Sequence, residues 1–277
     1  MSTLTPVLST APPPELSTPG LVVLFGNSPN GWKITIALEA LKSVGAIPDY
    51  TGVTVFLQSG EQFQPWFKEL NPNSKMPVLI DNRADKPRLV VFESGAILEY
   101  LARVYDRNFD FSFDDDDLHQ EMVNWIHLAQ ANLGPQQGQV NHFSRYSKVK
   151  CEYSLERFTT EVKRIYQVYE DHLSGAGTPS KTPREFLVGG KPSFADFCTQ
   201  PWLRCAFWGG LDISPASGLG HLAAYVERIE QITFVQHALK VPEQDLVTRI
   251  RSNPDLERQI MEKMKKQRDE QEQAKDE

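Results

Sequence analysis

Two short segments carry the residues of this chain whose types and order are typical of a ligand site. The first runs from Asn71 to Leu79, where an Asn-Pro-Asn-Ser turn leads through Met76 and Pro77 into an apolar stretch. Because Pro77 has no backbone N–H, it belongs at the start or the edge of a strand. A cis bond between Met76 and Pro77 would turn the N–H and C=O of Met76 outward, where they can pair with an extended peptide. The segment therefore predicts recognition of a peptide main chain.

The second segment begins at Glu93, at the end of an apolar strand expected over 89–92, and opens a helix at Ser94. The first N–H groups of a helix have no partner inside it, so those of Ser94 and Gly95 can donate to a carboxylate. Glu93 supplies a negative charge for an ammonium group. Together with the first segment, these groups describe a ligand with a peptide main chain, a carboxylate and an amine. A tripeptide such as glutathione has all three.

Composition limits the class of protein. The chain has 277 residues, 40% of them hydrophobic, and a formal net charge of −7. This length allows two globular domains, and no apolar run approaches the roughly 20 residues that a membrane span needs. Net negative charge argues against a nucleic-acid surface, which requires clustered Lys and Arg. We expect a soluble protein with no nucleic-acid or membrane partner, and the first residues, which lack the features of a secretory signal, predict a cytoplasmic location.

The three cysteines are Cys151, Cys198 and Cys205, and they form no Cys-x-x-Cys pair. This odd and sparse count predicts reduced thiols instead of a disulfide framework. Cys198 and Cys205 share one face of an expected helix, and we interpret both as buried core residues. The histidines lack the spacing of metal ligands, so we expect no metal site.

The spacing of apolar residues divides the chain into four parts. Residues 1–20 combine several prolines with Ser and Thr, which is typical of a disordered leader. Residues 21–107 predict the order β-α-β-α-β-β-α, which folds as a mixed sheet with helices on both faces. Residues 108–240 begin with a linker and an acidic run and then predict helices only. Residues 241–277 form a charged extension whose last residues are expected to be a solvated tail.

With these motifs placed, the chain resembles the cytosolic glutathione S-transferase superfamily, and within it the Nu-class and fungal nitrogen-regulator-like (URE type) branch. The resemblance covers about residues 21–240 and follows several motifs in order. They are Ser28-Pro29-Asn30-Gly31-Trp32-Lys33, Gly60-Glu61-Gln62-Phe63, the Asn-Pro-Asn turn with Lys75 and Pro77, Glu93-Ser94-Gly95-Ala96-Ile97-Leu98, and the segment 134–143. It implies an α/β thioredoxin-like N-terminal domain and an all-α, all-helical C-terminal domain, a homodimer, and glutathione as cosubstrate.

The resemblance also implies roles for individual residues. Asn30 matches the position whose side-chain amide lies near the glutathione sulfur, and Ser28 matches a hydroxyl that faces the same sulfur. Other matches to glutathione-binding positions are Gln62 and Lys75 for the glycine end, Met76 with Pro77 for the cysteinyl unit, and Glu93 with Ser94 for the γ-glutamyl end. Arg164 matches an arginine that in this class reaches into the site of the partner subunit.

The chemistry at the sulfur follows from its pKa. A thiol with an ordinary pKa of about 8.5 is only a few per cent thiolate near neutrality, and the thiolate is the nucleophile. Lowering this pKa by about two units requires roughly 2.7 kcal/mol of preferential thiolate binding. The Asn30 amide, the Ser28 hydroxyl and the dipole of the helix that starts near Gly31 can supply it. None of them is a base, so we predict that the site stabilises a bound thiolate for attack on an electrophile, a disulfide or a peroxide.

Several of these residues also have simple structural interpretations. Asn30 and Ser94 are common helix caps. Trp32 and Trp125 are candidates for a hydrophobic second-substrate pocket, and they are equally suited to be core aromatics. Two other functions stay open. One is a ligandin-type protein that binds hydrophobic molecules or glutathione conjugates with little turnover, and the other is a nitrogen-regulator-like protein that acts through a partner.

Overall fold

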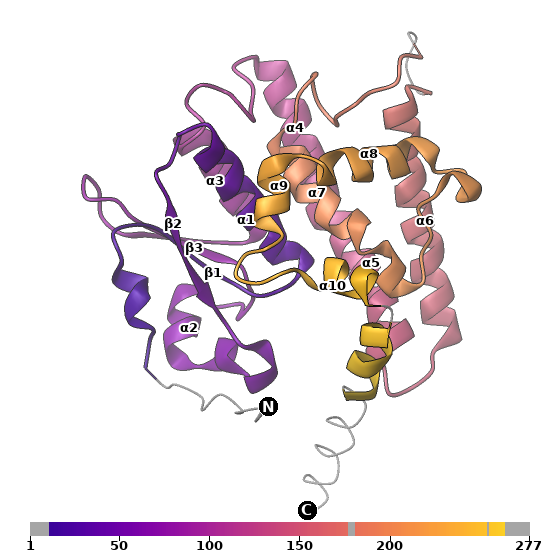
Figure 1. Cartoon of the computed structure of the whole chain (residues 1–277), viewed down its shortest axis with the longest axis horizontal. Helices are drawn as coiled ribbons and strands as arrows, with labels where there is room; N and C mark the ends of the chain where they lie inside the picture. Colours follow the sequence, from indigo (N-terminus) through magenta and orange to yellow (C-terminus); the bar gives the residue numbers. More distant parts are fainter. Residues whose placement is uncertain (1–10, 177–180, 254, 264–277) are drawn as a thin grey trace, which may run out of the picture.

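The computed structural model describes residues 11–176, 181–253 and 255–263. An α/β domain lies beside a helical domain, with the sheet and its helices in one half of the molecule (Figure 1). The elements of the first domain are β1 (Gly20–Phe25), α1 (Pro29–Ser43), β2 (Tyr50–Thr54), α2 (Pro65–Leu70), β3 (Val78–Asn82), β4 (Leu89–Phe92) and α3 (Ser94–Val104). This order confirms the predicted thioredoxin-like arrangement.

The sheet has the strand order β2-β1-β3-β4, with β1 and β2 parallel and the other neighbours antiparallel. Successive side chains of a strand point to opposite faces, so β1 contributes to two cores. Val23 belongs to the large core that includes α1 and α3, whereas Val22 packs with Phe67 of α2. Both faces are therefore covered by helices, as the alternation of elements predicts.

The second domain is helical in its described part. Its elements are α4 (Asp116–Leu128), α5 (Gly134–Asn141), α6 (Glu152–Ser174), α7 (Phe194–Arg204), α8 (Gly220–Glu230), α9 (Thr233–Ala238) and α10 (Leu246–Ser252). Two π-helical segments, η4 (Ala129–Leu133) and η5 (His142–Tyr146), continue α4 and α5. Such segments occur frequently at functional sites. Across the described residues, no helix combines the length and the apolar character needed to span a membrane.

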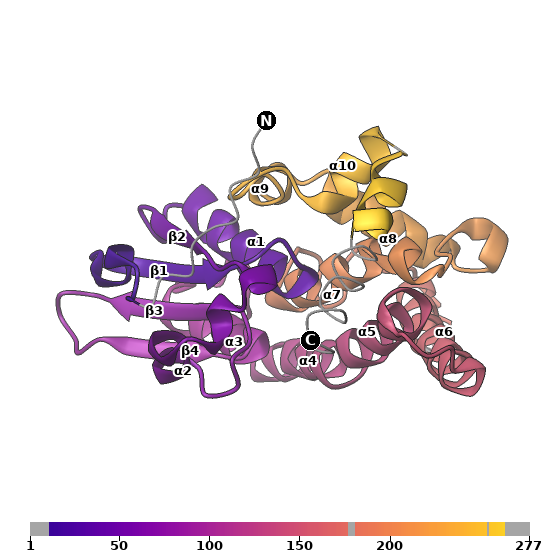
Figure 2. The same ribbon diagram turned by 90° about the horizontal axis from the view of Figure 1, so that it is seen from below.

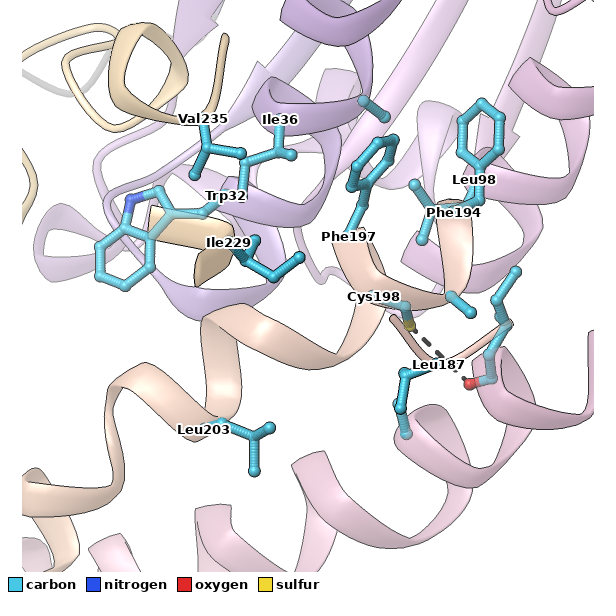
Figure 3. Close-up of a cluster of buried hydrophobic side chains, with 14 of the residues drawn as sticks. Trp32, Ile36, Leu98, Leu187, Phe194, Phe197, Cys198, Leu203, Ile229 and Val235 are labelled. Carbon is cyan, nitrogen blue, oxygen red and sulfur yellow. Dashed lines mark hydrogen bonds between the residues drawn. The ribbon is translucent and has the colours of Figure 1, made fainter. Parts of the chain in front are cut away.

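The two domains share one hydrophobic core. Helix α1 lies against α7 and α9 in both ribbon views (Figure 2). At this contact Trp32 and Ile36 of α1 lie near Val235 of α9, while Phe197 of α7 faces the same interior (Figure 3). Because these side chains are almost completely buried, groups on the two domains keep fixed positions relative to each other.

Part of the expected leader is packed onto the first domain. Pro14–Ser17 form a short 3₁₀ helix, η1, and Leu16 is buried against the sheet. The side chain of Asn82 donates hydrogen bonds to the carbonyl oxygens of Leu16 and Thr18, at 3.0 and 2.8 Å. One apolar anchor and these two hydrogen bonds order a proline-rich segment that composition alone describes as disordered. Residues 1–10 lie outside the described residues.

The charged C-terminal extension also begins as packed structure. Helix α10 buries Val247 and Ile250. Just before it, the fully buried Asp245 forms an ion pair with Arg204 of α7, whose side chain is 2% exposed. Further along, Glu257 pairs with Arg145 at 2.6 Å. Residues 264–277, which include the expected tail, lie outside the described residues.

Candidate functional site

A pocket of about 260 Å³ lies between the two domains. The α/β domain contributes the start of α1, the loop 71–77 and the start of α3. The helical domain contributes the junction of η4 and α5, covering 129–135, and Trp202 of α7. A larger cavity of about 720 Å³ is lined by β4, α3 and the start of α4, and it has no lining residue in common with the first. We place the candidate site in the smaller pocket because the predicted chemical groups meet there.

Several residues selected from the sequence line this pocket together. They are Asn30, Lys75, Met76, Pro77, Glu93 and Ser94. Ser94 begins α3, so its N–H and the next ones lack partners within the helix. The Met76–Pro77 peptide bond is cis. The pocket thus combines helix N–H groups, main-chain groups of a loop, two opposite charges and a side-chain amide.

Glu93 has a backbone conformation that is unusual for a residue with a side chain. Its φ is 70° and its ψ is 120°, in a region that costs a non-glycine residue free energy. Its carboxylate accepts a 3.5 Å hydrogen bond from the Asn73 side chain, which also lines the pocket. Backbone strain of this kind is concentrated at functional sites, which agrees with a ligand-binding role for this turn.

Other predicted residues lie outside the pocket lining. Ser28 is the N-cap of α1, and its hydroxyl oxygen accepts a hydrogen bond from the N–H of Gly31 at 3.2 Å. Gln62 is 8% exposed in the short helix η3 (Glu61–Phe63). Its Oε1 atom is buried and has no hydrogen-bond partner among the described residues. Arg164 is exposed on α6 and pairs with Glu161 at 2.7 Å.

Neither predicted pocket tryptophan lines the described pocket. Trp32 is 3% exposed inside the shared core, where the guanidinium carbon of Arg204 lies 5.7 Å from the centroid of its ring. Trp125 packs against Tyr169 and His172, with ring centroids 5.3 and 4.2 Å apart. These contacts fit the interpretation of both tryptophans as core aromatics. The tryptophan that does line the pocket is Trp202.

Trp202 fixes the orientation of the Asn30 side chain. The indole Nε1–H donates to Asn30 Oδ1 at 3.0 Å. An indole nitrogen can only donate, so the amide must present its oxygen to Trp202 and its Nδ2–H₂ group elsewhere. Gly134 permits this approach, because a Cβ at that position would lie 2.9 Å from the indole nitrogen. Asn30 therefore has amide hydrogens available for a negatively charged ligand atom.

A buried lysine forms one wall of the pocket. Lys33 is 1% exposed, and its Nζ donates to Gln130 Oε1 and, at 3.5 Å, to Ser94 Oγ. The Ser94 hydroxyl donates to the same Gln130 oxygen at 3.2 Å. Burial lowers the pKa of the Lys33 ammonium from its ordinary value, while neighbouring Cys198 and Glu93 oppose that shift. Cys198 lies on α7 among buried apolar side chains (Figure 3), and burial raises the pKa of its thiol.

The sequence motifs do not single out Lys33, Gln130 or Trp202 as site residues. The available signal for Lys33 is its place between Trp32 and Ile34, in a helical stretch that is otherwise apolar. Trp202 and Gln130 come from the other domain, and nothing in their local sequence points to the pocket. Among the described residues, no group of His, Cys, Asp and Glu is arranged to hold a metal ion.

Comparisons with known proteins place the chain in a family. The family model "Glutathione S-transferase, N-terminal domain" matches residues 20–103, and "Glutathione S-transferase, C-terminal domain" matches residues 140–232. The disulfide-bond oxidoreductase YghU of Escherichia coli (strain K12) is 35% identical over 185 residues, which cover 66% of this chain and 60% of YghU. This chain thus spans less than two thirds of YghU.

Solved structures agree with this placement. A glutathione transferase homolog from Lodderomyces elongisporus, with two GSH per subunit, has a TM-score of 0.72 and 31% identity, covering 81% of this chain and 99% of that one. The glutathione transferase URE2P8 from Phanerochaete chrysosporium, with oxidized glutathione, has a TM-score of 0.71 and 26% identity, covering 85% and 98%. The chain belongs to the glutathione S-transferase family, and its similarity to URE-type members confirms the resemblance found in the sequence.

Proposed function

We propose that this protein is a glutathione-dependent enzyme that binds glutathione in the pocket between its domains and stabilises the thiolate for attack on a disulfide. Attack on a peroxide or an electrophilic carbon uses the same thiolate. The observation that carries the proposal is the meeting of Asn30, Met76 and the Glu93–Ser94 turn in one pocket. These groups match the sulfur, the main chain and the γ-glutamyl end of one tripeptide.

In this proposal each end of glutathione has its own partners. The Glu93 carboxylate binds the amine, and the N–H groups at the start of α3 bind the γ-glutamyl carboxylate. The main chain of Met76 pairs with the cysteinyl unit. Lys75 and Gln62 attract the glycine carboxylate. The sulfur then lies at the start of α1, beside the Nδ2–H₂ group of Asn30.

The thiolate is stabilised by fixed dipoles. The Trp202 hydrogen bond holds Asn30 Oδ1, so that the amide hydrogens are oriented before the ligand binds. Helix α1 adds the positive end of its dipole. The Ser28 hydroxyl oxygen accepts the Gly31 N–H, and its own hydrogen remains available as a second donor to the sulfur.

Disulfide exchange then proceeds in two balanced steps. The bound thiolate attacks one sulfur of the disulfide, forms a mixed disulfide and releases the other sulfur as a thiolate. A second glutathione thiolate attacks the glutathione sulfur of the mixed disulfide, which releases the reduced substrate and glutathione disulfide. The naming of YghU as a disulfide-bond oxidoreductase supports this reaction class, as do two GSH per subunit in the Lodderomyces elongisporus relative.

Family membership also supports a cytoplasmic homodimer. In it, the exposed Arg164 of one subunit is proposed to reach toward the glutathione site of the other. No protein cysteine takes part in the proposed reaction, since Cys198 and Cys205 are buried and Cys151 does not line the pocket.

A coupled assay tests the proposal. Glutathione and bis(2-hydroxyethyl) disulfide are mixed with the protein, and glutathione reductase reports the glutathione disulfide formed through NADPH consumption. We expect saturable turnover well above the uncatalysed exchange. Calorimetric binding of glutathione without turnover of a disulfide, a peroxide or an aromatic electrophile would favour a ligandin instead, and absence of binding would reject the proposal.

The contact between Trp202 and Asn30 leads to a specific prediction. Replacing Trp202 with phenylalanine retains an aromatic ring but removes the N–H donor to Asn30 Oδ1. The amide is then free to rotate, and we expect kcat for disulfide exchange to fall about tenfold, since one unit in the thiol pKa corresponds to about 1.4 kcal/mol. KM for glutathione should change less than about threefold. A large rise in KM with unchanged kcat would show that Trp202 shapes the pocket without orienting the amide.

A further inference from the structure

Lys33 is a buried cation without a buried counter-charge. Its ammonium contacts two neutral groups, Gln130 Oε1 and Ser94 Oγ, and no described carboxylate forms an ion pair with it. Glu93 attracts it only through space, and the Glu93 side chain is exposed, so water screens its charge. Burial raises the pKa of the neighbouring Cys198 thiol against the opposing effect of Lys33, which favours a neutral thiol over a thiolate counter-charge.

A buried charge without a partner is costly, so proteins rarely retain one without a function. Lys33 lines the pocket. Its charge therefore lies close to the position that a ligand anion in the pocket would occupy. The hydroxyl of Ser94, 3.5 Å from Lys33 Nζ, stands at the first residue of α3. The ammonium and the unpaired N–H groups of this helix start therefore create positive potential at the same end of the pocket.

We propose that Lys33 is a binding residue for glutathione, and that it supplies the counter-charge for the α-carboxylate of the γ-glutamyl unit at the start of α3. This inference rests on the proposed glutathione site and deepens it by assigning one carboxylate of the ligand to one cation. In the free protein the charge is held by neutral oxygen acceptors. In the complex it is balanced by the ligand, which makes binding selective for a tripeptide that carries this carboxylate.

Gln130 connects this subsite to the helical domain. Its Oε1 accepts hydrogen bonds from Lys33 and Ser94 and a weaker one from the Cys198 thiol at 3.6 Å. Gly95 allows Gln130 to approach, because a Cβ there would lie 2.9 Å from its Cγ atom. The π-helical segment η4 carries Gln130, so this irregular turn positions the acceptor that holds the ammonium beside Ser94.

The test compares two ligands on two variants. Glutathione is compared with 4-aminobutanoyl-cysteinyl-glycine, which keeps the amine and lacks only the γ-glutamyl α-carboxylate. Calorimetry measures the Kd of each for wild type, Lys33→Met and Lys75→Met. Lys33→Met is expected to weaken glutathione binding about tenfold or more while changing the affinity for the analogue less than about twofold. Lys75→Met, at the glycine end, is expected to weaken both ligands by the same factor.

The thermal stability of the ligand-free Lys33→Met variant is expected to change in the opposite direction to its affinity for glutathione. Methionine is an unbranched side chain only one heavy atom shorter than lysine, and it removes a buried charge, so ligand-free Lys33→Met should melt at the same temperature as wild type or higher. Equal losses for both ligands, or no loss for glutathione, would overturn the role of Lys33 and leave the glutathione site in place. Absence of glutathione binding to the wild type would instead overturn the proposed function, and this inference with it.

Discussion

Replacing Asn30 with alanine is expected to lower kcat for glutathione-dependent disulfide exchange about 100-fold. The reason is that the amide lines the pocket in the first turn of α1, with its oxygen held by Trp202 at 3.0 Å, so that its hydrogens are free to donate to the ligand. Loss of one preorganised donor to a developing or bound anion typically costs about 10²–10³ in rate. Steady-state kinetics over a range of glutathione concentrations measure the change.

Affinity separates this role from a structural one. Binding of glutathione by calorimetry should stay within about threefold of wild type, because the other ligand groups come from Met76, Glu93 and Ser94. Asn27→Ala is a matched control, since Asn27 lies in the loop just before α1 and outside the pocket lining, where it accepts a long hydrogen bond of 3.4 Å from the N–H of Leu246. A rate for Asn30→Ala equal to that of this control would contradict the proposed stabilisation of the sulfur.

Replacing Asp245 with alanine is expected to lower the free energy of unfolding by about 3 kcal/mol or more. Asp245 is fully buried and pairs with Arg204, which is 2% exposed, and the pairing with Arg204 holds the pKa of the carboxyl below its ordinary value against the effect of burial. Removing Asp245 leaves the buried guanidinium with Glu230, at 2.5 Å, as its remaining described ionic partner, and breaking a buried ion pair costs about 3–5 kcal/mol. Thermal and urea denaturation measure the effect.

Two further variants make this prediction specific. Glu243→Ala removes an exposed carboxylate whose pair with Arg249 is 3.8 Å long, and it should cost less than about 1 kcal/mol. The double variant Arg204→Met with Asp245→Leu replaces the pair with apolar side chains and should recover most of the stability. If Asp245→Ala resembles Glu243→Ala, the extension is not held to α7 by this ion pair.

The fold follows closely from local patterns in the sequence. Alternation of short apolar strands and helical periodicity predicts the order of elements in the first domain, and the absence of strand patterns after residue 108 predicts the helical domain. The packed segment around Leu16 was not predicted, because one buried side chain and two hydrogen bonds from Asn82 are tertiary contacts. A composition rich in proline carries no information about them.

The site was predictable only where its residues lie in compact motifs. Met76 with Pro77 is such a motif and predicts pairing with a peptide main chain. Glu93 with Ser94 is another and predicts binding of an amine and a carboxylate. The contact of Trp202 with Asn30 spans 172 positions, and the contact of Lys33 with Gln130 spans 97. Such pairs are set by packing of the two domains. Conversely, Trp32 is an aromatic residue of the kind that lines hydrophobic pockets, but it packs in the core.

The thiol pKa of the complex shows whether the pocket binds glutathione with its sulfur ionised. Ultraviolet absorbance of the thiolate near 240 nm is recorded from about pH 5 to pH 10 with protein saturated by glutathione. We expect a pKa about two units below that of free glutathione, near 6.5. A bound thiol that titrates near 8.5, as it does in free solution, would contradict this expectation.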